Sequence, residues 1–196
     1  GVESVSDRKH NFNAGPAALP LEVLLQAQEQ FVNYGGAGMS IMEMSHRSGV
    51  YEQLNEETQS LLRELLNIPD NYHVLFLQGG ASTQFAMVPL NLLTGGKVAA
   101  YVETGSWASK ALKEAKLIGE TAVVATSKPD EYRRMPDLTN LVLPENAAYV
   151  HVTSNETIQG TQFKSFPDTG SVPLVADMSS DIMSRPIDVS KFGLIY

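Results

Sequence analysis

Cysteine is absent from the chain, and its absence excludes two kinds of chemistry. With 0 cysteines in 196 residues, the chain has no disulfide and no thiolate to act as nucleophile or metal ligand. Long apolar runs are absent too, since none approaches the roughly 20 residues that a membrane span needs. Residues 1–10 are polar and lack the apolar core of a secretory signal. We therefore expect a cytoplasmic protein without a membrane partner.

Positive charge is scarce relative to negative charge. Lys and Arg number 14 against 22 Asp and Glu, which gives a formal net charge of −8. A nucleic-acid partner needs a basic face opposite its phosphates, so we expect none. An anionic small molecule stays possible, because a few local cations decide its binding. The hydrophobic content of 43% is that of a globular chain, and the length suits one domain or part of a larger one.

The first third of the chain reads as turns and helices. Residues 11–16 combine Asn, Gly and Pro, which favour turns. Pro20 is well placed for the first turn of one helix, and a second helix is expected from about Tyr51 until it is ended by Pro69. Residues 34–49 have no clear period and are predicted to be a loop.

From residue 73 onward, short apolar runs alternate with helical patterns. Strands are expected at 73–77, 97–102, 121–125, 148–153, 174–177 and from 194 on, and helices at 82–93 and 106–118. Continuous apolar strands of this kind are typical of a parallel sheet that helices cover on both faces. Residues 127–145 are polar and punctuated by Pro, which indicates a surface excursion. The predicted fold class is α/β with a mostly parallel sheet.

Four polar segments each follow one of these strand-like runs. They are residues 78–84, 104–107, 154–157 and 176–180. Because open α/β sheets bind ligands beyond the carboxyl ends of their strands, we expect these segments to meet at one edge. Together they offer backbone amides, hydroxyls, a flat ring and a carboxylate. This set suits an anionic aromatic cofactor.

The first segment is a candidate phosphate site. In Gly79-Gly80-Ala81-Ser82-Thr83, backbone amides and two hydroxyls can converge on an anion at a helix N-terminus. A plain strand-to-helix turn is the alternative. The segment matches neither G-x-x-x-x-G-K-[ST] nor G-x-G-x-x-G, so a single phosphate monoester is favoured over a nucleotide.

Trp107 and Asp177 are candidates for contacts with an aromatic ring. Trp107 is the only tryptophan and opens a helix after a strand, where its indole can stack on a ring or anchor the core. Asp177 ends an apolar run, and a buried carboxylate needs a cationic partner. A protonated pyridine nitrogen is one such partner, while a cap for residues 179–180 is the alternative role.

The remaining candidates are polar residues in turn-like segments. Thr157, together with Asn155, can hydrogen-bond a ring hydroxyl, although Asn-Glu-Thr is also a common turn. His46 and Arg47 offer a forked donor for a carboxylate or phosphate, with a solvated surface position as the alternative. The other histidines show no metal-ligand spacing, and no metal is expected.

Taken together, these segments resemble the phosphoserine aminotransferases, a family of fold-type-I pyridoxal-phosphate enzymes within aminotransferase class V. The resemblance runs over nearly the whole chain and rests on residues 11–16, 39–47, 78–84, 104–107, 154–160 and 177–186. It implies an N-terminal segment, 1–20, followed by the large cofactor-binding domain over 21–196, incomplete at its C-terminus.

The resemblance implies a role for each of five cofactor-binding residues. In that family, the Gly-Gly-Ala-Ser turn holds the phosphate of pyridoxal 5′-phosphate, here through Ala81 and Ser82. The tryptophan that stacks on the pyridine ring matches Trp107. The threonine that meets the phenolic oxygen matches Thr157, and the aspartate that pairs with the ring nitrogen matches Asp177.

The resemblance also concerns the substrate and the catalytic residue. His46 and Arg47 match the pair that receives the distal anion of phosphoserine or glutamate. The Schiff-base lysine of the family lies a few residues beyond a Phe-Gly-Leu-Ile-Tyr strand, which here ends at Tyr196, and no lysine of the chain occupies that position. We therefore expect the lysine beyond Tyr196, and no transamination by this chain alone.

The function implied is that of a phosphoserine:2-oxoglutarate aminotransferase of serine biosynthesis, a homodimer that acts on phosphoserine, glutamate and 2-oxoglutarate. One alternative is another fold-type-I pyridoxal-phosphate reaction, such as that of a β-lyase or a desulfurase-like enzyme. A second alternative is a non-catalytic fragment or binding module. Activity with phosphoserine and 2-oxoglutarate distinguishes the implied function from the first alternative. The intact mass of the sample distinguishes it from the second.

Overall fold

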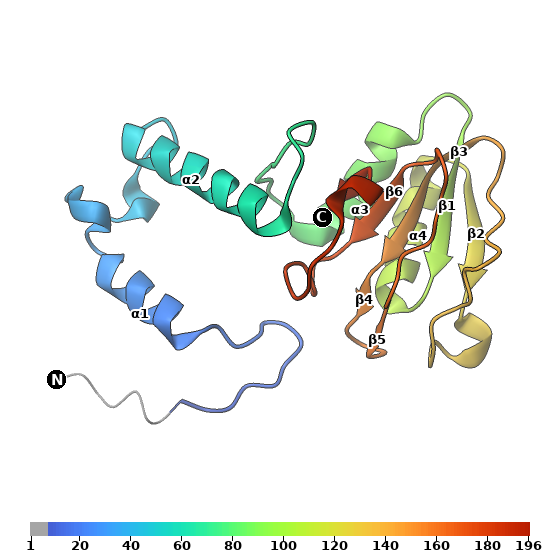
Figure 1. Cartoon of the computed structure of the whole chain (residues 1–196), viewed down its shortest axis with the longest axis horizontal. Coiled ribbons are helices and arrows are strands. Elements are labelled where there is room, and N and C mark those ends of the chain that lie inside the picture. Colours follow the sequence, from blue (N-terminus) through green and yellow to red (C-terminus); the bar gives the residue numbers. More distant parts are fainter. Residues whose placement is uncertain (1–7) are drawn as a thin grey trace. The chain divides into compact units, whose positions relative to one another are not determined.

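The computed structural model describes residues 8–196, which divide into two compact units (Figure 1). The first unit ends at Glu64, and the second runs from Leu65 to Tyr196. The predicted division after residue 20 separates a terminal segment rather than a compact unit, and it stays a prediction.

The first unit consists of helices joined by turns. α1 spans Leu21–Gln30 directly after Pro20, as the sequence predicts. α2 spans Gly49–Leu66, so that its last two residues belong to the second unit. The stretch between them was predicted to be a loop, and it contains two short 3-10 helices, η2 at Tyr34–Gly36 and η3 at Ile41–Glu43.

A five-stranded parallel sheet forms the centre of the second unit. Its strands lie in the order β2-β1-β3-β6-β7, and all four neighbouring pairs are parallel. Their bounds are Val98–Glu103 (β1), Thr121–Thr126 (β2), Ala147–Thr153 (β3), Leu174–Asp177 (β6) and Leu194–Ile195 (β7). A separate two-stranded hairpin, β4 at Asn155–Glu156 and β5 at Thr161–Gln162, follows β3. The predicted α/β class with a mostly parallel sheet is confirmed.

One predicted strand is wrong. Residues 73–77 form no strand, and the side chains of Leu75, Phe76 and Leu77 are 69%, 55% and 55% exposed. A strand is stable only when a neighbour satisfies its backbone groups, and the sheet of the described residues ends at β7. The apolar run alone therefore did not decide the structure of this segment.

Side chains alternate between two buried faces of the sheet. On the first face, α3 (Gly80–Leu92) and α4 (Ser106–Ile118) cover a cluster that includes Ala99, Tyr101, Tyr149 and Val175. On the second face, loop residues such as Phe163, Phe166 and Phe192 cover a cluster that includes Val102, Val150, Val152 and Ala176. Of the helical cover expected on both faces, the α-helices of this unit supply the first, and loop segments pack on the second.

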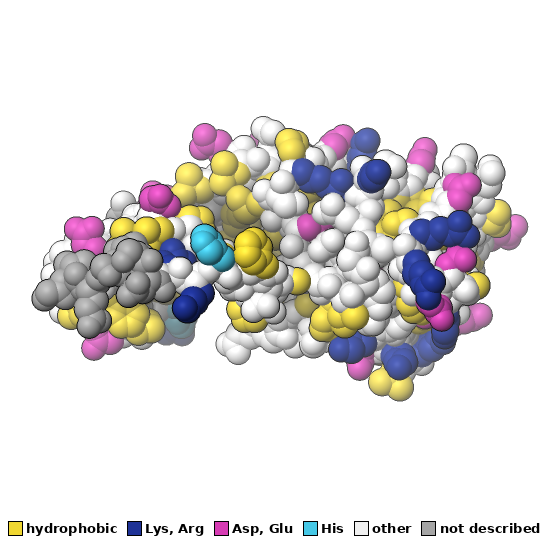
Figure 2. Space-filling model, turned by 90° about the horizontal axis from the view of Figure 1, so that it is seen from below, with side chains coloured by type: hydrophobic (Ala, Val, Ile, Leu, Met, Phe, Trp, Pro, Cys, Tyr) yellow, Lys and Arg dark blue, Asp and Glu magenta, His cyan; other side chains and the backbone are white. Residues whose placement is uncertain are grey.

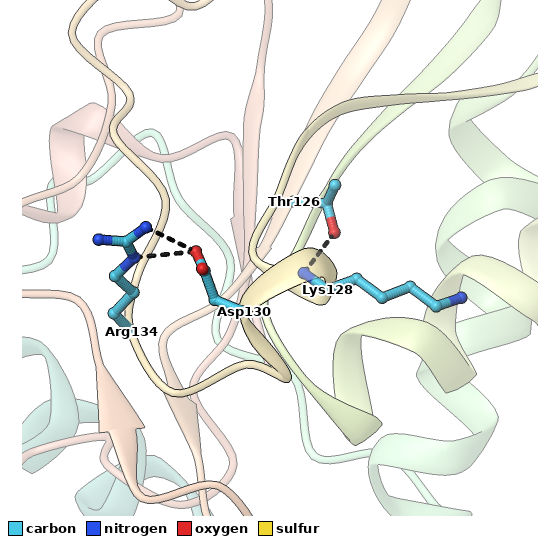
Figure 3. Close-up of polar contacts among 4 residues, drawn as sticks. All are labelled: Thr126, Lys128, Asp130 and Arg134. Atoms are coloured by element: carbon cyan, nitrogen blue, oxygen red, sulfur yellow. Dashed lines mark hydrogen bonds and ion pairs between the residues drawn. The ribbon is translucent and has the colours of Figure 1, made fainter.

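The excursion predicted at 127–145 begins with a tight turn beyond β2. The 3-10 helix η4 spans Lys128–Asp130, and the Oγ1 of Thr126 accepts a hydrogen bond from the backbone N–H of Lys128 at 3.1 Å (Figure 3). Asp130 and Arg134 form an exposed ion pair at 2.9 Å. A pair this exposed contributes on the order of 0.5 kcal/mol, so the turn depends mainly on its backbone bonds.

The surface carries charges of both signs. Figure 2 shows Lys and Arg side chains interspersed with Asp and Glu side chains on the face that it draws. Within residues 8–196, no helix is both long and apolar enough to cross a bilayer.

Candidate functional site

The strand order places a topological switch point at the carboxyl ends of β1 and β3. From β1 the chain turns into α4 on the first face, whereas from β3 it leads to Phe163 and Phe166 on the second face. The two connections thus diverge from neighbouring strands. Open α/β sheets bind ligands at such a switch point, and the predicted segments 104–107 and 154–157 lie there.

Trp107 and Thr157 are in direct contact at this switch point. The indole Nε1–H donates to Thr157 Oγ1 at 2.9 Å. Because this bond uses a lone pair of the hydroxyl, the hydroxyl proton of Thr157 stays free for an acceptor such as a phenolate oxygen. The ammonium of Lys110 lies 4.2 Å from the centre of the indole ring, a cation–π contact, and the half-buried indole also packs against the core cluster of the first face.

Glu156 ties the loop after β3 to the start of α4. Its side chain is fully buried. Its Oε2 accepts from the N–H of Trp107 and its Oε1 from the N–H of Ala108, both at 2.9 Å, with Thr104 Oγ1 at 3.5 Å. Burial raises the pKa of Glu156, against the effect of the two backbone hydrogen bonds, and the charge of Asp177 raises it further. The sequence alone did not point to this residue.

Asp177 ends β6 beside Thr153, its register partner in β3. The side chain is 5% exposed, and its Oδ1 accepts from the N–H of Ser179 at 3.0 Å and from Ser179 Oγ at 2.6 Å. Asp177 therefore does cap residues 179–180, the alternative role considered for it, but only through Oδ1. Its Oδ2 is not engaged by Ser179. Burial raises the pKa of Asp177, the bonds from Ser179 oppose that rise, and Asp181 adds to it. A cationic partner at Oδ2 would lower the pKa of Asp177 and so favour its ionised form.

The turn before α3 has the shape of an anion site. Gly79 and Gly80 both have left-handed backbone conformations, with φ of 92° and 57°. A Cβ at Gly79 would lie 2.0 Å from Thr83 Oγ1, so glycine is required there. No side chain caps the N-terminus of α3, which leaves its first amides open beside Ala81 and Ser82.

One detail of the predicted anion site is corrected. Two hydroxyls were expected to converge on the anion, but Thr83 Oγ1 donates to the carbonyl of Gly79 at 2.9 Å. Ser82 is exposed and supplies the other hydroxyl. A groove of about 720 Å³ includes Gly80, Ala81, Ser179 and Tyr196 in its lining, so the open turn and the loop that follows Asp177 border the same space.

Two candidates lie in the other unit. His46 and Arg47 are exposed on the turn between η3 and α2, where the N–H of Arg47 donates to Ser45 Oγ at 3.2 Å. The structure thus brings Trp107 into contact with Thr157 and sets Ala81, Ser82 and Asp177 in the same unit. That His46 and Arg47 complete their site stays a prediction.

A layer of aromatic side chains lies beneath Asp177 on the first face. His151 Nε2 and the hydroxyl of Tyr196 are 2.8 Å apart, and the hydroxyls of Tyr101 and Tyr149 are 2.9 Å apart. Burial lowers the pKa of His151 to about 3, which keeps the imidazole neutral. Among residues 8–196, no cluster of three His, Asp or Glu side chains is arranged to hold a metal ion.

Comparison with known proteins adds three findings. The chain matches the aminotransferase class-V family over residues 9–196. A phosphoserine aminotransferase of Niallia circulans is 64% identical over 98% of this chain and 53% of its own length. The solved phosphoserine aminotransferase of Bacillus circulans subsp. alkalophilus superposes with a TM-score of 0.93 at 64% identity, over 96% of this chain and 52% of that chain.

A more distant relative has been solved with a cofactor. The pyridoxal-phosphate-bound phosphoserine aminotransferase of Trichomonas vaginalis is 41% identical, with a TM-score of 0.89, over 96% of this chain and 53% of that chain. The chain therefore spans about half the length of the relatives that it matches.

Proposed function

The chain belongs to the aminotransferase class-V family, and on that premise we propose that it is part of a phosphoserine:2-oxoglutarate aminotransferase of serine biosynthesis. The observation that carries the proposal is the Trp107–Thr157 hydrogen bond at the switch point, in the same unit as the buried carboxylate of Asp177. Identity of 64% to a phosphoserine aminotransferase supports the choice of substrate.

The residues present fit pyridoxal phosphate. Asp177 is a buried carboxylate whose raised pKa indicates that a cationic neighbour would be favourable, and its Oδ2 is not engaged by Ser179. The flat, half-buried indole of Trp107 suits an aromatic ring, and the open amides of the first turn of α3, at Ala81 and Ser82, suit a phosphate. The fit is thus chemical and involves three different groups of one cofactor.

Each of these residues has a separate task. When bound, pyridoxal phosphate supplies an electron sink for negative charge at the substrate's α-carbon. Asp177 would hold the proton on the ring nitrogen, and Thr157 would donate to the phenolic oxygen. Trp107 would fix the ring plane. Ala81 and Ser82 would anchor the phosphate at the positive end of α3.

The substrate's distal anion is assigned to the first unit. His46 and Arg47 would receive the phosphate of phosphoserine or the side-chain carboxylate of glutamate, since a guanidinium binds such groups through paired hydrogen bonds. A homodimer in the cytoplasm belongs to the same proposal.

The test is activity of the full-length protein. We expect a phosphoserine- and 2-oxoglutarate-dependent formation of glutamate, together with the visible absorbance of bound pyridoxal phosphate. Cysteine desulfuration or β-elimination in place of amino transfer would establish the other fold-type-I reaction. A protein that takes up no pyridoxal phosphate would overturn the proposal.

A further inference from the structure

We propose that Glu156 is a positioning residue that holds Trp107 and Thr157 in place for the cofactor ring before the cofactor binds. The contacts of Glu156 come from the structure alone, whereas the identity of the ring rests on the proposed function. The inference assigns a role to a buried carboxylate that has no direct part in holding the cofactor.

The carboxylate of Glu156 binds the start of α4 through both of its oxygens. Both oxygens of Glu156 are engaged by amides of the first turn of α4, Oε2 by Trp107 and Oε1 by Ala108. Hydrogen bonds to an ionised acceptor at a helix N-terminus are among the stronger ones in proteins. Trp107 is thus fixed at its backbone by a residue 49 positions away along the chain.

α4 has no local cap. Its N-cap residue is Gly105, which has no side chain to satisfy the first amides. A Cβ at Gly105 would lie 2.6 Å from the Cδ of Glu156 and 2.6 Å from Oε1 of Gln159. Because residue 105 is glycine, there is room for the carboxylate of Glu156 beside the start of α4.

Glu156 links Trp107 to Thr157, the two residues that contact each other at the switch point. Glu156 immediately precedes Thr157, and its amide partner Trp107 carries the indole that donates to Thr157. Gln159 adds a parallel tie, since its Oε1 accepts from the N–H of Ser106 at 3.2 Å and its Nε2 donates to Ser106 Oγ at 2.8 Å. The hydrogen bond from the Trp107 N–H to Glu156 thus fixes the distance between the Trp107 and Thr157 backbones, and the indole–hydroxyl hydrogen bond forms across that distance.

The cation–π contact of the indole restrains the ring only weakly. Lys110 lies over the ring but is exposed, and an exposed cation–π contact stabilises by only about 0.5–1 kcal/mol. Glu156 is fully buried, and removing its acceptor oxygens leaves buried amides without partners. The order of Trp107 is therefore expected to depend on Glu156 far more than on Lys110.

The test uses the full-length protein labelled with 5-fluorotryptophan and freed of cofactor. Trp107→Phe identifies the ¹⁹F signal of Trp107. In the wild type we expect one sharp signal without cofactor, whose position changes little when pyridoxal phosphate is added. In Glu156→Gln, one amide faces an NH₂ group instead of an oxygen, so we expect a broadened or divided signal and roughly tenfold weaker binding of pyridoxal phosphate.

Two further variants complete the experiment. Glu114→Gln makes the same chemical change at an exposed position on α4, and we expect it to match the wild type. Glu156→Asp keeps the charge but shortens the reach, so it provides an intermediate effect if Glu156→Gln does not fold.

The outcomes separate the inference from the proposed function. A sharp Trp107 signal and unchanged affinity in both Glu156 variants would overturn the inference, even if the wild type binds pyridoxal phosphate. Loss of order in the cofactor-free variants would uphold the positioning role, even if the wild type took up a different aromatic ligand.

Discussion

The two helices that begin at the site differ in how their first amides are satisfied. α3 and α4 are both 13 residues long, and each follows a glycine that offers no capping side chain. At α4, the carboxylate of Glu156 occupies the position of an anion. At α3, no side chain caps the helix. The amides of α4 thus bind a carboxylate of the protein itself, whereas those of α3 are open to an anion from outside the chain.

This difference favours α3 as the place for the cofactor's phosphate. A helix N-terminus binds an anion through its free amides and its positive end. α4 cannot do so because its amides at Trp107 and Ala108 are already used. A second anion, that of the substrate, then needs cations from elsewhere, which is the role proposed for His46 and Arg47.

The strongest way to break the comparison is to give α3 a carboxylate of its own. Ser82→Asp places a negative charge among the open amides, where it competes with and repels a phosphate. Like charges in contact cost several kcal/mol, so we expect roughly 10³-fold weaker binding of pyridoxal phosphate. The helix itself should be as stable as before or slightly more so. Titration and thermal unfolding measure both quantities, and Ser82→Asn is the neutral control.

The next effect concerns Asp177 at the carboxyl end of β6. Asp177→Asn keeps the phosphate contacts and the Trp107 face, so pyridoxal phosphate should still bind within about tenfold of the wild-type affinity. The neutral amide no longer favours a protonated ring nitrogen, and we expect kcat to fall by roughly 10²–10³-fold, as when one preorganised electrostatic partner is removed. A kcat within a few fold of the wild type would contradict the pairing of Asp177 with the ring.

A third prediction concerns the substrate's anion. Arg47→Ala removes a charge-assisted fork, which should lower kcat/KM for phosphoserine by roughly 30-fold, or about 2 kcal/mol. Cofactor binding should not change. Alanine lacks a distal anion, so its kcat/KM should change much less. Equal losses for the two donors would show that Arg47 does not receive the distal anion.

The smallest expected effect is a pH dependence of stability. Asp177 and Glu156 both have raised pKa values, chiefly through burial, whereas residues 79–83 contain no titratable side chain. A folded-state pKa above the ordinary value means that the native state binds the extra proton. The free energy of unfolding should therefore fall as pH rises from about 4 through the raised pKa values, with a slope of at most about 1.4 kcal/mol per pH unit for each carboxyl group.

Urea unfolding of the cofactor-free protein between pH 4 and pH 8 measures this slope. We expect Asp177→Asn to flatten it and Ser82→Ala to leave it unchanged. Bound pyridoxal phosphate should also reduce the slope, because a cation beside Asp177 lowers its pKa. A slope that is the same in Asp177→Asn would show that other groups cause it.

Much of the sheet was predictable because buried parallel strands are continuous apolar runs. Residues 97–102, 148–153 and 174–177 were expected as strands and lie within or next to β1, β3 and β6. Residues 73–77 form the same kind of run but are not paired. An apolar pattern indicates that burial would be favourable, but it does not indicate whether a neighbouring strand is present.

The site was predictable where position along a strand decides it. Trp107 and Thr157 lie shortly after the parallel strands β1 and β3, and Asp177 is the last residue of β6, so parallel topology alone predicts that they lie near one edge of the sheet. Glu156 was missed because its partners are about 50 positions away and Asn-Glu-Thr reads locally as a turn. The available signal was Gly105, since a helix that starts after glycine without a capping side chain needs an acceptor from elsewhere.

The two glycines at the start of α3 differ in which substitutions they tolerate. At Gly80 a Cβ meets nothing within 4 Å, so only its φ of 57° restricts substitution, and Asn or Asp can occupy that region. At Gly79 both the φ of 92° and the contact with Thr83 oppose any side chain. In a saturation library selected for growth, position 79 should therefore keep glycine alone, even when position 83 also varies, while position 80 should retain a small polar minority.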